Sequence, residues 1–294
     1  MTWFVQALVD ATSIGSIYAL TALGIGLIFG IMRLINFAHA EFITIAVYIV
    51  MLTIAFGFPV ALLAAGIGVL ILALLSERLA FRPVRGADPS TLLITSFALS
   101  YLLQNTLVLV FGARPSGLNI LPELSQPILV GGVRLPIIHL VTIAVTVLPL
   151  AATGTFLRKT RMGIEMRAAA ADFQMARLLG VRANRVIAAA FGLSGILATA
   201  AAILYVAQTG VVEPRLGLHL ALIGFVATVV GGMGSLPGAV LGGLAVGMVT
   251  VFLQVLLPAD LRPYREAFVY LAVILVLVLR PQGLFRPASA RERV

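Results

Sequence analysis

The sequence has no cysteine and few charged residues among its 294 positions. Without a thiol the chain can form no disulfide and can use no thiolate chemistry. Only 11% of the residues are charged, whereas 61% are hydrophobic, a balance far from that of soluble domains. Apolar runs such as LAVILVLVL also lack the alternation of membrane β-strands. We therefore expect an all-α polytopic transmembrane helical bundle, with residues 1–294 forming a single domain.

Nine apolar runs are long enough to be considered as membrane helices, within an expected total of about eight to ten spans. The glycine-rich stretch 231–238 interrupts the last long apolar region, and the run before it is short for a full crossing. This pair is therefore predicted to be either two spans or a broken, re-entrant element. The expected spans are 4–31, 41–56, 59–76, 91–111, 137–157, 186–207, 218–231, 238–257 and 267–280.

Positive charge is unevenly distributed over the connections between these spans. If the basic stretch 158–185 is cytoplasmic, fifteen Lys and Arg residues lie inside and five lie outside. This bias predicts an outer N-terminus and a cytoplasmic C-terminal end that carries Arg280, Arg286, Arg291 and Arg293. The net charge of +9 therefore indicates membrane topology rather than nucleic-acid binding. The outer connection 112–136 is expected to pack over the outer mouth, either as a structural plug or as a docking surface.

Charged side chains avoid the centres of the predicted spans, with Asp10 the deepest acidic residue. Ion-coupled carriers commonly use intramembrane ionisable groups, so their absence disfavours such a carrier. The remaining polar candidates for a translocation path are neutral or sit at span ends. They are Asn36, His39 and Glu41 beside the second span, Gln104 and Asn105 in the fourth, and Gly231, Gly232 and Gly234 in the glycine-rich stretch.

Each of these candidates also has a structural explanation. Asn36, His39 and Glu41 could cap the second helix or shape an inner gate, and they lack the further ligands of a metal site. The amides of Gln104 and Asn105 could make interhelical hydrogen bonds or line a polar path. The glycines could serve close packing or expose backbone to a pathway.

The stretch 158–185 contains seven of the twenty cations and is rich in alanine. A helical wheel places Met166, Ala169, Ala170, Phe173 and Ala176 on one face, which predicts a short helix with an apolar face exposed to the cytoplasm. Gly180 stands where a left-handed cap would end this helix. The segment could rest on anionic lipid or grip a cytoplasmic partner.

Several stretches carry a family resemblance. ADFQMARLLGV followed by NRVIAAAF resembles the cytoplasmic EAA loop of ABC importer permeases. YALTALGIGLIFGIMRLINFAHAEF, VVGGMGSLPGAVLGG and LRPQGLF resemble the permeases of branched-chain amino-acid ABC importers. The resemblance implies a short coupling helix that fits a cleft on an ATPase subunit. It assigns this role to Glu165, Arg167, Asp172, Phe173, Gln174, Ala176, Arg177 and Gly180.

One residue departs from the family pattern, because Gln174 stands where the loop commonly has Glu. A charged contact to the ATPase would be lost there, with Asp172 or Glu165 as possible replacements. The chain itself has one lysine, Lys159, and no glycine-rich phosphate loop precedes it. ATP and Mg²⁺ are therefore expected on partner subunits, and this chain is expected to be non-catalytic and to bind no cofactor or metal.

The resemblance further implies a bacterial inner-membrane complex with a second related permease, two ATPases and a periplasmic substrate-binding protein. The expected cargo is a branched-chain or other hydrophobic amino acid, although the family also serves urea, short amides and aromatic acids. Rival functions are an ion-coupled carrier, a membrane enzyme acting on lipid, and a scaffold without transport. Outer arginines that could contact the binding protein are Arg114, Arg134, Arg215, Arg262 and Arg265.

Overall fold

The computed structural model describes residues 2–130 and 133–285, and in these ranges the chain is a bundle of eleven α-helices. The helices are α1 (Thr2–Met32), α2 (His39–Thr53), α3 (Phe58–Leu75), α4 (Pro89–Phe111), α5 (Ile137–Lys159), α6 (Arg161–Ala171), α7 (Phe173–Leu178), α8 (Ala183–Thr209), α9 (Leu216–Gly231), α10 (Leu236–Leu256) and α11 (Arg265–Leu279). Four short strands accompany them: β1 (Ser116–Gly117), β2 (Pro127–Val130), β3 (Val133–Pro136) and β4 (Val211–Val212).

A helix occupies each of the nine predicted spans, which confirms the polytopic helical bundle. Seven of the described helices are long and apolar enough to cross a membrane, so the chain is a multi-pass membrane protein. Helix α9 has only 16 residues and is about 24 Å long, less than the ~30 Å of hydrocarbon. The break predicted at 231–238 is real, since α9 ends at Gly231 and α10 begins at Leu236.

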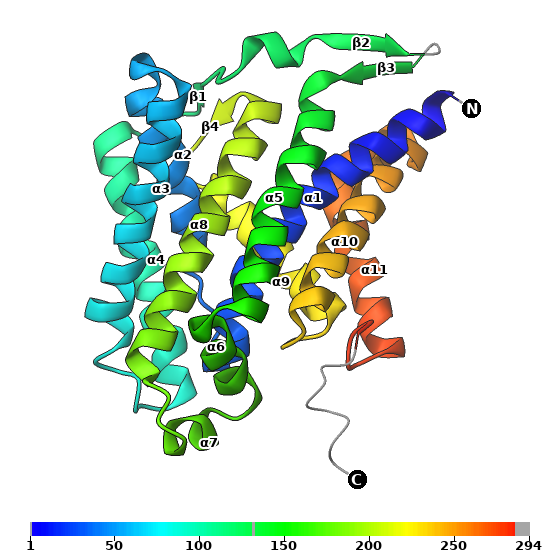
Figure 1. Ribbon diagram of the computed structural model, residues 1–294. Coiled ribbons are helices and arrows are strands. Elements are labelled where there is room, and N and C mark those ends of the chain that lie inside the picture. Colours follow the sequence, from blue (N-terminus) through cyan, green and yellow to red (C-terminus); the bar gives the residue numbers. More distant parts are fainter. Residues whose placement is uncertain (1, 131–132, 286–294) are drawn as a thin grey trace.

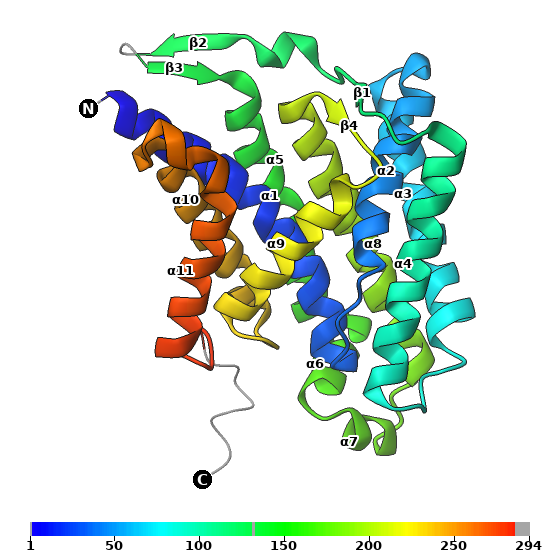
Figure 2. The ribbon, with the colours of Figure 1, turned by 180° about the vertical axis from the view of Figure 1, so that it is seen from behind.

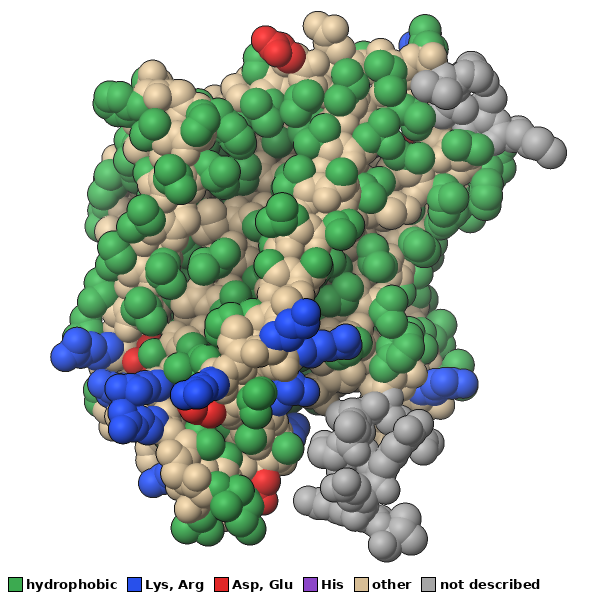
Figure 3. Space-filling view, in the orientation of Figure 1, with side chains coloured by type: hydrophobic (Ala, Val, Ile, Leu, Met, Phe, Trp, Pro, Cys, Tyr) green, Lys and Arg blue, Asp and Glu red, His purple; other side chains and the backbone are tan. Residues whose placement is uncertain are grey.

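The two ends of the bundle differ in charge. Helix α1 begins at the end that carries β2 and β3, and α11 ends at the opposite end of the bundle, the end where α6 and α7 lie (Figure 1). On the face drawn in Figure 3, Lys and Arg side chains gather at the α6–α7 end, below a broad band of hydrophobic side chains. This arrangement agrees with a cytoplasmic α6–α7 end. Arg286, Arg291 and Arg293 lie outside the described residues.

Helix α1 is the axis of the bundle, with α5, α8, α9 and α10 packed around it. Helix α10 packs most closely against α1, and glycines of α10 lie at the contact. A Cβ added at Gly247 would lie 2.2 Å from Gly15 Cα, and one added at Gly243 would lie 2.4 Å from Ala19 Cα. Small residues thus let the two backbones touch, the usual device of helix packing in lipid.

Helix α2 begins inside the bundle rather than at its inner end. Segment 33–38 leaves α1 and rises without helical structure toward the middle of the bundle (Figure 2). His39 contacts Ser194, eleven residues along α8, and Glu41 contacts Ser100, eleven residues along α4. Both partners therefore lie about 16 Å from the inner ends of their helices. Non-helical backbone is tolerated at this depth because protein surrounds it.

The first turn of α9 meets the first two turns of α2. The backbone N–H of Gly217 donates to Thr44 Oγ1 over 3.1 Å. A Cβ at Gly217 would fall 1.8 Å from the carbonyl oxygen of Ala40, so only glycine permits this contact. Two helices of the bundle thus start next to each other in its interior.

The outer connection 112–136 crosses the outer end of the bundle from α4 to α5, as expected (Figure 1). Leu118 and Ile120 anchor it by inserting into the core. Strand β1 pairs antiparallel with β4, and β2 pairs antiparallel with β3. These short strands lie outside the apolar spans and were not predicted from the sequence.

The contact between α1 and α10 generates a stability prediction. Gly247→Ala should destabilise the fold by roughly 1–3 kcal/mol, because the added methyl forces the two backbones apart. The effect is measured as a shift in melting temperature in detergent. Unfolding is monitored through the loss of the monodisperse protein as the temperature rises. The matched control is Gly66→Ala on α3, where an added Cβ meets nothing within 4 Å. An equal melting temperature for the two variants would contradict the packing argument.

Candidate functional site

The cytoplasmic stretch 158–185 forms two helices rather than one. Thr160 caps α6 by accepting a hydrogen bond from the N–H of Gly163 at 3.0 Å. Asp172 ends α6 in an extended conformation and caps α7, its carboxylate accepting from the N–H of Met175 at 2.9 Å. Aspartate at such a position satisfies an orphan N–H and stabilises the new helix start. The predicted single helix is therefore broken at Asp172.

The apolar face predicted for this stretch packs inward, so its expected exposure to the cytoplasm was wrong. Met166, Ala169 and Ala176 are buried against the core of the bundle, and Ala170 and Phe173 are half-buried. A helical wheel identifies an apolar face but does not say whether the protein's own core or a partner covers it. Here the core covers it.

A different apolar surface is exposed at the end of α7. Met175 is 53% exposed, Leu178 81% and Leu179 80%. We call these three residues the α7 tip. Predicted coupling residues Asp172, Gln174 and Arg177 surround it and are exposed as well. Three large apolar side chains in water beyond a folded bundle indicate a contact surface.

Gly180 ends α7 as predicted. Its φ of +90° is left-handed, its N–H donates to Arg177 O, and the N–H of Val181 donates to Ala176 O, both at 3.0 Å. These two bonds form a Schellman motif, which favours glycine. The motif fixes the direction of the chain immediately after the α7 tip.

Arg167 and Glu165, the remaining predicted coupling residues, lie on α6. Arg167 is exposed and lines a cavity of about 410 Å³ between α6, the inner end of α1 and the turn before α10. Glu165 is half-buried. Helix α6 packs against α1, α5 and α8, so it connects the α7 tip to three helices of the membrane bundle.

An ion pair that sequence reasoning missed anchors the other end of this stretch. Glu77, buried two residues after the end of α3, pairs with Arg85, whose Nη1 also donates to Asn184 Oδ1 at 2.7 Å. Asn184 lies in the first turn of α8, at the C-terminal end of the cytoplasmic stretch. Burial lowers the pKa of Arg85, and the facing carboxylate opposes that shift. The spacing of eight residues between Glu77 and Arg85 gives no recognisable sequence signal.

Asn36, His39 and Glu41 come together at the internal start of α2. The Ser194 hydroxyl lies 2.9 Å from His39 Nδ1 and donates to Gly24 O at 2.9 Å. Ser100 donates to Glu41 Oε1 at 3.0 Å. Three buried polar atoms in this cluster lack a hydrogen-bond partner among the described residues: Asn36 Nδ2, His39 Nε2 and Glu41 Oε2.

This cluster corrects the expectation that acidic groups stay near span ends. Glu41 is fully buried about halfway through the bundle, deeper than Asp10. In the sequence Glu41 stands at the beginning of an apolar run, where a membrane surface was expected. In the structure that run begins in the interior of the bundle. Asn36 Oδ1 accepts from the N–H of Ala38 at 3.1 Å in the turn before α2, but this bond does not cap the helix, because the N-cap is Ala38 itself. The Asn36 amide also lines a small cavity against α1 and α9.

Gln104 and Asn105 are not part of this cluster. They lie on α4, at the edge of the bundle, and are half-buried. Asn105 Nδ2 donates to Tyr101 O of its own helix at 2.7 Å. The Nδ2 group of Asn105 therefore bonds within its own helix and does not form the interhelical hydrogen bond that was one of its two explanations.

Gly231 and Gly232 contact the segment after α11. The N–H of Leu284 donates to Val230 O at 2.8 Å, and that of Phe285 donates to Gly231 O at 3.1 Å. Gly232 has φ of +108°, and a Cβ there would lie 2.2 Å from Phe285 O. The last carbonyl groups of α9, which the break between α9 and α10 leaves without helical partners, thus accept hydrogen bonds from the segment after α11. Close packing, one of the two explanations for these glycines, accounts for both.

Two further polar contacts join the outer halves of helices. His139 Nδ1 lies 2.7 Å from Asp10 Oδ1, connecting α5 to α1. Gln208 Nε2 donates to Ser13 Oγ at 2.7 Å and to Thr142 Oγ1 at 2.9 Å, connecting α8 to the same two helices. The unusual depth of Asp10 gave a sequence signal for this network, but its partner His139 could not be identified from the sequence.

The outer arginines differ in availability. Arg114, Arg134, Arg215 and Arg262 are exposed, whereas Arg265 is half-buried and donates to Gln254 Oε1. Arg262 also donates from Nε to Leu257 O at 3.2 Å. Arg114 and Arg134 lie on the outer connection, which places them at the surface of the outer end.

Known proteins share this sequence over almost its whole length. The chain is 34% identical over 301 residues to the high-affinity branched-chain amino acid transport system permease protein BraD of Pseudomonas aeruginosa, covering 96% of this chain and 95% of BraD. It is 35% identical over 299 residues to LivH of Salmonella typhimurium, with the same coverage. The autoinducer 2 import system permease protein LsrC of Klebsiella pneumoniae is 34% identical over 49% of this chain and 42% of LsrC.

Among solved structures, PsaBC from Streptococcus pneumoniae in complex with Fab aligns at 14% identity, covering 99% of this chain and 94% of that one. Its TM-score of 0.47 is too low to support a conclusion. The family model for the permease component of the branched-chain amino acid transport system matches residues 7–278. Together with the relatives of 34–35% identity, this match shows that the chain belongs to the family of branched-chain amino acid transport system permease components.

Proposed function

We propose that this chain is a permease subunit of an ATP-driven importer of the inner membrane, carrying branched-chain or similar hydrophobic amino acids. The observation that carries the proposal is family membership over residues 7–278, together with relatives named as permeases of high-affinity branched-chain amino acid transport. The chain has no phosphate-binding loop, so hydrolysis of ATP is assigned to two partner ATPases. A second permease and a periplasmic binding protein complete the proposed complex.

The α7 tip is the proposed contact to an ATPase. Its three apolar side chains are exposed, and Asp172, Gln174 and Arg177 supply a polar rim, the usual anatomy of a protein interface. The Schellman motif at Gly180 and the cap at Asp172 hold the tip rigidly. Movement of the ATPase would therefore reach the membrane through α6 and through the Arg85–Asn184 contact.

The proposed translocation path passes the internal start of α2. Broken helices in transporters direct the polar groups of their ends at the cargo. Unpartnered polar atoms are rare inside proteins and call for an explanation. A path that opens beside Asn36, His39 and Glu41 would give their free atoms water or cargo as partners. Alternating access then consists of opening this region to one side of the membrane at a time.

A buried carboxyl group such as that of Glu41 is also found in ion-coupled carriers, so the proposed ATP-driven transport must be tested against ion coupling. Vesicles containing the chain, its second permease, the ATPases and the binding protein should take up leucine only when ATP is supplied. A protonophore should leave this uptake unchanged, because ATP supplies the driving force. Uptake of labelled leucine that needs no ATPase, or that collapses with the proton gradient, would contradict the proposal.

Charge at the α7 tip should uncouple the complex. The double substitution Leu178→Glu/Leu179→Glu should lower the amount of co-purified ATPase by more than about tenfold, because two apolar anchors are replaced by carboxylates. Both side chains are exposed, so the bundle itself should fold normally. ATP-dependent uptake should fall with the ATPase content.

The matched control for this substitution is Leu129→Glu, an exposed leucine on β2 at the opposite end of the bundle. It should co-purify with the unaltered amount of ATPase. Ala176→Glu is unsuitable, because Ala176 is buried and its substitution would disturb folding. Full ATPase content in Leu178→Glu/Leu179→Glu would remove the α7 tip from the interface.

A further inference from the structure

Helices α5 and α10 both pack against α1 and leave a cleft between them. The cleft has a volume of about 630 Å³, and Leu23 of α1 forms its floor. Leucine and valine side chains from both helices form its walls. Val147 and Leu241 on its rim are exposed, so it opens on the surface of the bundle. We call it the α5–α10 cleft.

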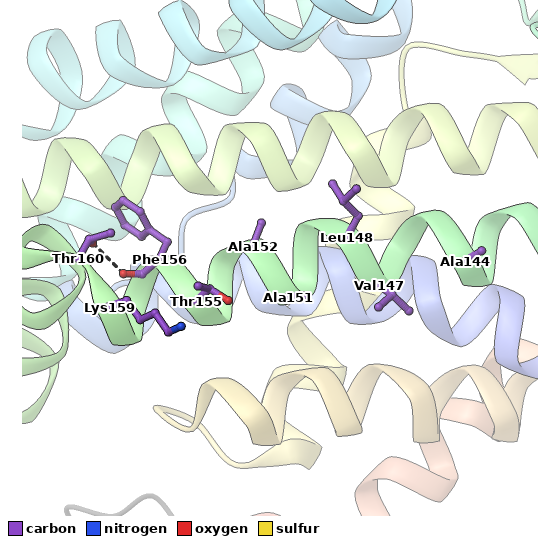
Figure 4. A pocket seen from close by; sticks show the side chains of 9 residues that line it. All are labelled: Ala144, Val147, Leu148, Ala151, Ala152, Thr155, Phe156, Lys159 and Thr160. Atoms are coloured by element: carbon purple, nitrogen blue, oxygen red, sulfur yellow. Dashed lines mark hydrogen bonds between the residues drawn. The ribbon is translucent and has the colours of Figure 1, made fainter.

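The α5–α10 cleft lies in the inner half of the bundle, where it opens toward the hydrocarbon of one leaflet. It includes the last turns of α5 and the first turns of α10, both next to the cytoplasmic end. The neighbouring surface in Figure 4 is different, because all its labelled residues come from α5 or from Thr160 directly after it. That surface has one wall, whereas the α5–α10 cleft has two walls and a floor.

Two arginines stand at the cytoplasmic end of the α5–α10 cleft. Arg158 of α5 and Arg167 of α6 both line it, and no carboxylate does. Both are exposed, and within the described residues neither has a carboxylate within 4.0 Å. Lys159 extends toward the α10 side in Figure 4, adding a third cation nearby. The partial positive charge of the α10 N-terminus has the same sign.

The charged end continues under α6. Arg167, Leu157 and Leu236 line both the α5–α10 cleft and the inner cavity of about 410 Å³ beneath α6. An apolar slot that opens to the membrane therefore leads to a second, smaller cavity at the cytoplasmic end, which Arg167 also lines. This sequence of surfaces matches an acyl chain followed by a phosphate.

We propose that the α5–α10 cleft binds one anionic phospholipid of the cytoplasmic leaflet. An acyl chain occupies the slot between α5 and α10, and the phosphate binds the guanidinium groups of Arg158 and Arg167. Guanidinium groups bind phosphate with paired hydrogen bonds, and cations near an anionic leaflet attract its lipids. The inference depends on the membrane location of the chain and not on its transport partners.

Such a lipid would join α10 to α5 and α6, with which α10 has few direct contacts. Arg158 belongs to α5, Arg167 to α6, and the second apolar wall to α10. The α7 tip follows α6 directly, so the lipid would brace the helix that carries the tip. Anionic lipid would then be a structural component of the cytoplasmic end.

Removing the two charges tests the headgroup contact. The full-length chain in detergent is mixed with phosphatidylglycerol or phosphatidylcholine, and bound lipid is counted by native mass spectrometry. Phosphatidylglycerol should bind more tightly than phosphatidylcholine. Arg158→Gln/Arg167→Gln should weaken the binding of phosphatidylglycerol about thirtyfold and that of phosphatidylcholine much less, because the choline cation already offsets the attraction of its phosphate to the arginines. The charge-matched control Arg78→Gln/Arg182→Gln lies outside the cleft and should bind as the unaltered chain does.

Filling the slot tests the acyl-chain contact separately. Gly154 lines the cleft, and a Cβ there meets nothing within 4 Å. Gly154→Phe should weaken the binding of both lipids, whereas Gly66→Phe on α3 should weaken the binding of neither. Equal binding of the two lipids to the unaltered chain would overturn the proposal, as would unchanged phosphatidylglycerol binding in either cleft variant. Binding of soluble glycerol 3-phosphate as tight as that of the lipid would also overturn it.

Discussion

The close contact between α1 and α10 is the constraint on which the bundle depends. Membrane helices lack a hydrophobic driving force toward one another, so they associate through close packing and hydrogen bonds. Gly15, Gly243 and Gly247 bring the two backbones together, and the remaining core helices surround the pair. With α1 fixed as the axis, α8 and α9 can each reach the interior, where α2 begins.

Two sequence stretches that are far apart form one structural unit at the cytoplasmic end. The segment after α11 bonds to the last carbonyls of α9, and Gly232 leaves room for its backbone. The turn that follows lines the cavity beneath α6, together with Arg167. The glycine-rich turn, the LRPQGLF segment and the cytoplasmic helices are therefore neighbours, so a change in one of them would be felt by the other two.

The spans could be predicted because each long apolar run must satisfy its own backbone in lipid, and helices do so locally. The cytoplasmic stretch was harder, because Asp172 breaks it and because the wheel cannot identify what covers Ala176. The depth of Glu41 was missed for a related reason, since α2 begins inside the bundle and its start carries no local signal. Pairs such as Asp10 with His139, and Glu77 with Arg85, depend on folding and cannot be read from spacing.

The internal start of α2 also affects how the protein is made. His39 is synthesised 155 residues before its partner Ser194, and the first turn of α9 follows later still. At a synthesis rate of about 5–20 residues per second, Ser194 is made roughly 8–31 s after His39. During that time the first turn of the 15-residue α2 lacks the partners that surround it in the folded bundle. Completion of the membrane bundle is thus delayed until α8 and α9 have been inserted.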